Sequence, residues 1–202
     1  MNADRVNAAI KAGAVILDLR PPHIFATGHL PGAINLQFNR ADLADRATMA
    51  LPATLECIIH AEPEPVARVA ATILDEAGFS VSGYLEGGLQ AWRTEGLTVE
   101  TMPVIDVTTL RDNLDRYCVL DAREPFEYRH GHVPGAASLP WAESWRRYGE
   151  MSPKAPLAVY CGTQVRSSLT ASVLRRHGRD ATVVVGGMSD WLERGYAVDA
   201  HP

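Results

Sequence analysis

The segment VYCGTQVRSS (159–168) combines a thiol and a guanidinium at a fixed spacing. Cys161 follows an apolar run, and Arg166 comes five positions later. Small Gly162 and Thr163 let the backbone curl, so that successive N–H groups point inward and can bind an anion. A helix starting there adds the positive end of its dipole, which favours the thiolate form of a cysteine. The pattern predicts that Cys161 is a nucleophile and that Arg166 can fork onto oxyanions.

An internal repeat shows how this segment relates to the rest of the chain. Residues 15–36 match residues 118–139 at a constant offset of 103, with ten of 22 positions identical. A second block, 85–99, matches 184–198 at an offset of 99. The chain is therefore expected to contain two copies of one domain, at 1–100 and 104–202, with Pro103 as a plausible hinge.

Both copies alternate apolar runs with helical patterns. Strands are predicted at 14–19, 55–60, 79–84, 117–122, 157–161 and 181–185, and helices at 66–78, 89–96, 165–178 and 188–195. Short apolar strands alternating with helices favour an α/β fold, in which a parallel sheet is covered on both faces. Cys161 falls where a strand ends and a helix begins, and ligands bind at that edge of such sheets.

The remaining cysteines are interpreted as core residues. Cys57 corresponds to Leu157 and Cys118 to Val15 in the other copy, and free cysteine behaves as a small hydrophobe. An odd count of three cysteines also argues against a disulfide scaffold. No Cys-x-x-C or His/Cys cluster suggests zinc.

These motifs together resemble the rhodanese family of sulfurtransferases. The resemblance rests on VLDAREPFEYRHGHVPGAASLP, the cysteine loop and GGMSDWLERGY, and it covers nearly the whole chain as two tandem domains. It implies a parallel sheet of about five strands in each domain, flanked by helices. It also implies transfer of sulfane sulfur, with the working cysteine in the second domain.

The resemblance further implies a two-step reaction through a persulfide. Cys161 would take sulfur from a small anionic donor, and the loop N–H groups would cradle it before a thiol or cyanide, or a protein acceptor, removes it. No metal or organic cofactor is needed. CGT resembles the start of mercaptopyruvate-type loops, which usually lack a closing arginine, so thiosulfate and 3-mercaptopyruvate both stay open as donors. The residues expected to bind the sulfur are Gly162, Thr163, Gln164, Val165, Arg166 and Ser167.

Polar residues outside the loop are expected to be mainly structural. Asp121 and Arg123 recur in both copies, as Asp18 and Arg20, and a carboxylate at a strand end can tie down a neighbouring loop. Glu127, which is Ile24 in the first copy, is a weaker candidate for the site. The segment WAESWRRYGE (141–150) could either wall a pocket or form a solvated amphipathic helix.

The first copy has lost the features of the loop. Ala61 stands at the cysteine position, and Val66 replaces the arginine. Proline at 63 and 65 removes two N–H donors, and glutamate at 62 and 64 places negative charge where an anion would enter. This copy is expected to be a structural partner without catalytic activity.

Composition narrows the alternatives. A net charge of −5 argues against nucleic acid as a partner, and the start of the chain has neither a secretory signal nor a membrane span, so a cytoplasmic location is expected. Two functions other than sulfur transfer stay open: a non-catalytic module that binds a partner, and a phosphatase or arsenate reductase of the same fold. The latter enzymes need a loop one residue longer than the four residues between Cys161 and Arg166.

Overall fold

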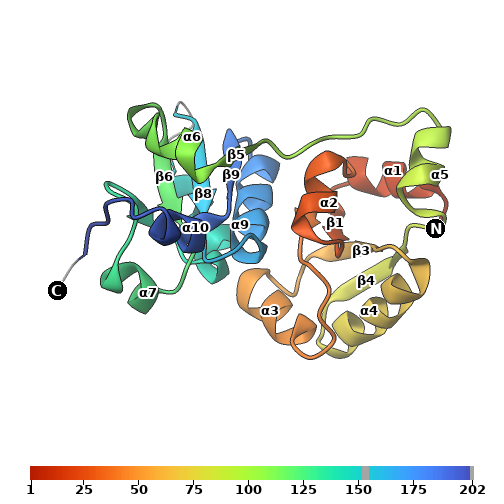
Figure 1. Cartoon of the computed structure of the whole chain (residues 1–202). Coiled ribbons are helices and arrows are strands. Elements are labelled where there is room, and N and C mark those ends of the chain that lie inside the picture. The colour runs from red at the N-terminus through yellow and green to blue at the C-terminus, as the bar shows by residue number, and fades with distance from the viewer. Residues whose placement is uncertain (152–154, 201–202) are drawn as a thin grey trace. The chain divides into compact units, whose positions relative to one another are not determined.

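The structure, a computed structural model, describes residues 1–151 and 155–200. The chain divides into two compact units, Met1–Thr101 and Met102–Pro202 (Figure 1). Each unit has its own parallel sheet with helices on both faces, which confirms the predicted fold class.

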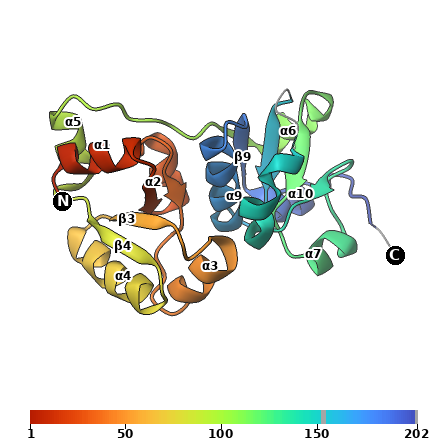
Figure 2. The same ribbon diagram turned by 180° about the vertical axis from the view of Figure 1, so that it is seen from behind.

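The first unit contains a four-stranded sheet in the order β2-β1-β3-β4. Helices α1, α2 and α5 lie on one side of this sheet, and α3 and α4 lie on the other (Figures 1 and 2). The strands are β1 (Val15–Asp18), β2 (Ile34–Asn35), β3 (Glu56–His60) and β4 (Ser80–Tyr84), and the helices are α1 (Ala3–Lys11), α2 (Pro22–Thr27), α3 (Leu43–Ala50), α4 (Glu64–Glu76) and α5 (Gly88–Thr94).

The second unit contains a five-stranded sheet in the order β5-β9-β8-β6-β7. Helix α9 packs on one side of β8 and β9, and α6 and α10 lie on the other (Figure 2). The strands are β5 (Val104–Asp106), β6 (Cys118–Asp121), β7 (Ala137–Ser138), β8 (Leu157–Tyr160) and β9 (Ala181–Val185). The helices are α6 (Val107–Arg111), α7 (Pro125–His130), α8 (Ser144–Arg147), α9 (Val165–Arg176) and α10 (Gly187–Glu193), with 3₁₀ turns at Leu114–Arg116, Trp141–Glu143 and Tyr148–Glu150.

The two sheets differ by one edge strand. The positions that correspond to β5 are residues 1–3, and α1 already begins at Ala3. Met1 alone continues the pairing there: its amino group donates to Tyr84 O at 2.6 Å, and its carbonyl accepts from Glu86 N at 3.0 Å. One residue is too short for a strand, so the first sheet has four strands where about five were expected.

The central strands explain why the sheets are stable. All four residues of β1 and of β8 are buried, as expected for parallel strands covered on both faces. Cys57 on β3 is buried, as predicted, but the prediction for Cys118 is wrong because this residue is exposed. Cys118 is the first residue of β6, and only the three residues after it enter the core. Among the helices that the structure describes, none combines the length and the apolar character needed to cross a membrane.

Candidate active site

The loop after β8 carries the predicted nucleophile into the start of α9. Cys161 directly follows the last residue of β8, and Gln164 is the residue before α9 begins at Val165. The Cys161 thiol donates to Ser167 Oγ at 3.5 Å, and the Ser167 hydroxyl donates to Gln164 O at 3.2 Å. Ser167 thus holds the sulfur atom over the first turn of the helix.

The backbone of this loop leaves its donors free. Within residues 1–151 and 155–200, the structure shows no hydrogen bond donated by the N–H groups from Gly162 to Ser167. The first N–H groups of a helix lack partners in the helix itself, and here they extend the row of loop donors. An anion held near Cys161 Sγ would therefore meet several unpaired N–H groups and the positive end of a 12-residue helix.

The start of α10 fixes the loop from behind. Met188 N donates to Cys161 O at 2.7 Å, and the Ser189 hydroxyl donates to Gly162 O at 2.9 Å. The approach requires glycine at 187, since a Cβ there would lie 2.1 Å from Cys161 O and the backbone φ is +55°. The double glycine of the second repeat block thus serves to bring α10 against the cysteine loop.

Arg166 forms a paired contact with Glu127 on α7. Arg166 Nη1 donates to Glu127 Oε2, and Nη2 donates to Glu127 Oε1 at 3.1 Å. Burial alone would raise the pKa of Glu127, but the guanidinium lowers it. For Arg166, burial opposes the charge, and the carboxylate outweighs it and raises the pKa. The arginine is therefore held in place by a carboxylate of its own unit.

This pair was missed at the sequence level. The repeat comparison marked Glu127 as a variable position because Ile24 replaces it in the first copy. A usable signal was present: Glu124 and Glu127 form a capping box at the start of α7, which fixes Glu127 in the first turn. That turn follows β6, and the carboxyl ends of β6 and β8 are adjacent in the sheet.

Asp121 and Arg123 form a buried pair beneath the site. Arg123 Nη2 donates to Asp121 Oδ2 at 2.6 Å and to Gly131 O at 2.7 Å, and Tyr160 donates its hydroxyl to the same Asp121 Oδ2 at 2.6 Å. Burial and the carboxylate raise the pKa of Tyr160 far above its ordinary value, so the phenol stays neutral. The pair ties the end of β6 to the GHVPGA turn.

Other polar residues singled out in the sequence lie in structural contacts. Trp141 is buried and donates Nε1 to Glu124 at 2.7 Å, and Arg147 pairs with Glu143 and Glu150. His132 Nδ1 lies 2.9 Å from Tyr128 O. Among the described residues, no three or more His, Cys, Asp and Glu side chains are grouped as a metal site would require.

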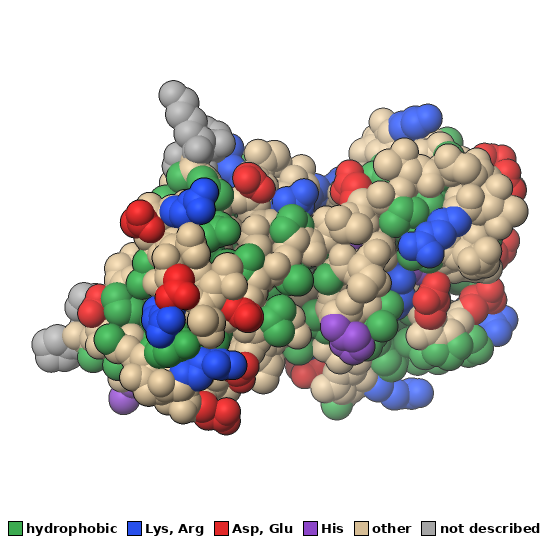
Figure 3. Space-filling view, turned by 45° about the horizontal axis from the view of Figure 1, so that its top comes forward, with side chains coloured by type: hydrophobic (Ala, Val, Ile, Leu, Met, Phe, Trp, Pro, Cys, Tyr) green, Lys and Arg blue, Asp and Glu red, His purple; other side chains and the backbone are tan. Residues whose placement is uncertain are grey.

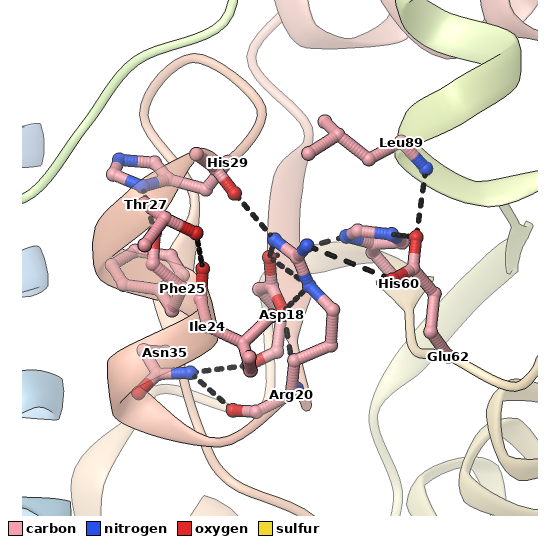
Figure 4. Close-up of polar contacts among 11 residues, drawn as sticks. Asp18, Arg20, Ile24, Phe25, Thr27, His29, Asn35, His60, Glu62 and Leu89 are labelled. Atoms are coloured by element: carbon pink, nitrogen blue, oxygen red, sulfur yellow. Dashed lines mark hydrogen bonds and ion pairs between the residues drawn. The ribbon is translucent and has the colours of Figure 1, made fainter.

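The equivalent place in the first unit holds a closed cluster of charges (Figure 4). His60 Nδ1 lies 3.1 Å from Asp18 Oδ2, and His60 Nε2 lies 3.5 Å from Glu62 Oε1. Arg20 Nη2 donates to Asp18 at 2.5 Å, and Leu89 N donates to Glu62 Oε1 at 3.1 Å. The Glu62 carboxylate thus accepts from α5 in the way that the Cys161 carbonyl accepts from α10.

The cluster shifts the pKa of each of its acids and of its histidine. Burial would raise the pKa of Asp18, but hydrogen bonds from His60 and Arg20 lower it to about 2. The neighbouring His60 and the amide of Leu89 lower the pKa of Glu62 to about 2. Burial opposes the charge on His60, yet the two carboxylates raise its pKa above 6.5. The two acids of the cluster are therefore paired with Arg20 and His60 of the same unit, and the Glu62 carboxylate would repel an outside anion at this loop.

The fold and the loop define a class of α/β proteins that present a cysteine at a helix start on the carboxyl edge of a parallel sheet. The profile of the family described as "Rhodanese-like domain" matches residues 2–95 and 106–194. The chain belongs to this family, in two tandem copies.

The chain is also similar to several individual proteins. The putative thiosulfate sulfurtransferase SseB of Mycobacterium tuberculosis is 28% identical over 230 residues, which cover 83% of this chain and 81% of that protein. The thiosulfate sulfurtransferase GlpE of Stutzerimonas stutzeri is 35% identical over 91 residues, covering 45% of this chain and 80% of its own. Among solved structures, a rhodanese-related protein from Thermoplasma volcanium is 31% identical over 48% of this chain and 97% of its own, with a TM-score of 0.47.

Proposed function

We propose that this protein is a rhodanese-type sulfurtransferase that works through a persulfide on Cys161. The observation that carries the proposal is the row of unpaired N–H groups from Gly162 to Ser167 at the start of α9. A persulfide is an anion that protrudes one sulfur beyond Sγ, and such a row of donors can hold it. Membership in the rhodanese-like family and relatives named thiosulfate sulfurtransferases support the same activity.

The reaction with thiosulfate has two steps. The Cys161 thiolate attacks the outer sulfur of thiosulfate, a new S–S bond forms, and the bond to the sulfonate sulfur breaks so that sulfite leaves with the electron pair. In the second step, an acceptor thiolate or cyanide attacks the sulfane sulfur, and the electron pair of the Cys161–sulfur bond returns to Cys161 Sγ. No proton donor or cofactor is required for either displacement.

Arg166 acts in this scheme through the shape and charge of the loop. Its guanidinium is already bound to Glu127, so it contributes less to the binding of a sulfur donor than an unpaired arginine would. The uncommitted loop amides are left as the main binding groups for the sulfonate of thiosulfate or the carboxylate of 3-mercaptopyruvate. We favour thiosulfate because SseB and GlpE, described above, are both named thiosulfate sulfurtransferases.

The first unit, residues 1–100, is proposed to be a non-catalytic partner of a catalytic domain at 104–202. Its loop has no thiol. The Glu62 carboxylate accepts a hydrogen bond from Leu89 N and lies beside His60. A phosphatase or arsenate reductase activity is disfavoured by the short loop between Cys161 and Arg166.

Intact mass after incubation with thiosulfate tests the proposal. The wild-type chain is expected to gain the mass of one sulfur atom and to lose it on addition of cyanide. Cys161→Ser should gain none, whereas Cys57→Ala and Cys118→Ala should load normally, because the first lies in the core and the second on the surface. A wild-type chain that takes up no sulfur would favour the non-catalytic module, and loading of Cys161→Ser would move the nucleophile elsewhere.

A further inference from the structure

A pocket lies beside the proposed sulfur-transfer loop in the second unit. Its volume is about 460 Å³, within the range that holds a small organic molecule. One wall is formed by α7 and the residues on either side of it: Arg123, Phe126, Glu127, His130 and Gly131. The other wall is formed by α10 and the segment after it: Met188, Leu192 and Val198.

The topology places this pocket next to the end of the strand that carries the nucleophile. Helix α7 follows β6 and α10 follows β9, and β8 lies between these two strands in the sheet. Two lining residues contact the cysteine loop directly: Met188 through its N–H on Cys161 O, and Glu127 through its pair with Arg166. A molecule in the pocket is therefore adjacent to the loop that would hold the persulfide.

The chemistry of the walls selects an apolar ligand. Phe126, Leu192 and Val198 are exposed by 57%, 56% and 40%, large values for apolar side chains. Each polar side chain of the lining has at least one partner within the protein. Arg123 binds Asp121, Glu127 binds Arg166, and His130 Nδ1 lies 2.7 Å from Phe126 O. The two ion pairs cancel in charge, so the pocket offers apolar surface and no net attraction for a dianion.

The first unit lacks this open space at the equivalent glycine. Gly28 corresponds to Gly131, and a Cβ there would meet Arg93 Nη2 at 3.0 Å and Val99 Cγ1 at 3.1 Å. A Cβ at Gly131 would meet Val198 atoms, at 3.8 and 3.9 Å. Arg93 occupies the helix position that is Leu192 in the second unit. The space is thus filled in the unit whose loop has Ala61 and open in the unit whose loop has Cys161.

The geometry points to a binding site for the apolar body of a small organic thiol that accepts sulfur from Cys161. This inference rests on the proposed function. The acceptor thiolate attacks the outer sulfur of the Cys161 persulfide, a new S–S bond forms, and the electron pair of the old S–S bond goes to Cys161 Sγ. The products are the organic persulfide and the Cys161 thiolate.

Two probes separate binding from transfer. Benzyl methyl sulfide has the apolar body but no thiol, so ligand-observed NMR measures its binding without any reaction. Benzyl mercaptan and 2-mercaptoethanol then compete as acceptors, at equal thiolate concentration, for protein preloaded with thiosulfate. We expect the wild type to discharge at least about tenfold faster, per unit concentration, to benzyl mercaptan, because a buried aromatic ring contributes that much binding.

The matched variants are Leu192→Arg, which installs the residue of the first unit, and Val104→Arg. Val104 is 48% exposed on β5 and outside the lining, so it controls for the added charge. Leu192→Arg should weaken binding of benzyl methyl sulfide about tenfold and abolish the acceptor preference, while loading from thiosulfate stays normal. Phe126→Ala, on the opposite wall, should act in the same direction.

The outcomes discriminate between the two proposals. A wild type that takes no sulfur from thiosulfate refutes the proposed function, and the binding measurement still decides whether the pocket takes an apolar body. Binding of benzyl methyl sulfide that is absent, or unchanged in Leu192→Arg, overturns the inference. A second result would also overturn the inference. If Leu192→Arg slows discharge to glutathione but leaves discharge to benzyl mercaptan unchanged, the pocket would favour a peptide partner.

Discussion

In both units the last residue of a central strand contacts a buried aspartate, but the residue type differs. The strand is β3 in the first unit and β8 in the second. His60 contacts Asp18 in one, and Tyr160 contacts Asp121 in the other. The imidazole of His60 also lies 3.5 Å from the Glu62 carboxylate of the loop, and although burial opposes its charge, the two carboxylates raise its pKa. The Tyr160 hydroxyl instead accepts from Val133 N in the GHVPGA turn. The residue at the strand end thus contacts a loop carboxylate in the first unit and a turn amide in the second.

The charged partners of the two loops also come from different places. In the first unit the acid is Glu62 of the loop itself, and its carboxylate pairs with Arg20 and His60. In the second unit the loop supplies the cation, Arg166, and its acid comes from α7. Both arrangements pair acids with bases, but only in the second is the row of loop N–H groups uninterrupted by proline. Basic and acidic side chains are likewise interspersed on the face of the molecule in Figure 3.

The largest effect is expected from breaking the cluster of the first unit. His60→Gln removes the cation between two carboxylates that are held ionised, and it should cost about 3 kcal/mol of stability in that unit. Hydrogen exchange of the β1 and β3 amides measures this opening within the intact chain. His23→Gln, at an exposed position, is the matched control and should leave exchange unchanged.

The same variant predicts a pH dependence. The pKa of His60 is raised in the folded chain, so its contribution is complete below its ordinary value of 6.5 and is lost as pH rises through the folded value. The pKa values of Asp18 and Glu62 are lowered, so their contributions vanish as pH falls toward about 2. The difference between wild type and His60→Gln should therefore be largest between pH 4.5 and 6.5 and should shrink at higher pH. A difference that grows above pH 7 would contradict a charged His60.

A smaller effect is expected from the pair that distinguishes the second unit. Arg166→Lys cannot keep the forked contact with Glu127, and kcat/KM for thiosulfate should fall about tenfold. Glu127→Gln should give a similar loss. The double variant should be little worse than either single one, because both act on the same contact. Additive losses in this double-mutant cycle would show that Arg166 binds the donor independently of Glu127.

The smallest effect is expected from returning a thiol to the first unit. Ala61→Cys combined with Cys161→Ser should stay at background in the thiosulfate assay, because Pro63 and Pro65 lack N–H donors and Glu62 lies beside the new thiol. Exchanging Glu62 for Gly, its counterpart in the second unit, in the same chain should not rescue activity either. Sulfur transfer well above background in the first of these variants would refute the importance of the donors.

The sequence was sufficient for features that either repeat or depend on short segments. The central strands β1, β3, β4, β6, β8 and β9 and the helices α4, α5, α9 and α10 followed from periodicity and from the internal match. The short strands β2, β5 and β7 and the remaining helices were not predicted, because segments of two to nine residues carry little periodic signal. Cys118 was misplaced because the repeat showed only that valine is tolerated there, and the first residue of a strand need not enter the core.

Features that depend on contacts between distant segments could not be predicted in this way. Glu127 and Arg166 are 39 positions apart and have no counterpart in the first copy. Glu62 was expected to repel an entering anion, but its carboxylate folds back onto Leu89 N and His60. Both outcomes depend on which side chain fills a given space, and a one-dimensional pattern does not specify that.

The double glycine before α10 gives the two copies unequal freedom to diverge. Both glycines have a positive φ, +55° at Gly187 and +57° at Gly88, so a side chain would strain the backbone at either position. At Gly187 a Cβ would also collide with the Cys161 carbonyl, a backbone atom that cannot move without moving the cysteine. At Gly88 the nearest atom is the end of the Glu62 side chain, which can rotate aside. A change at Gly187 would therefore displace the cysteine loop itself, whereas the steric part of a change at Gly88 could be relieved by a second change at Glu62.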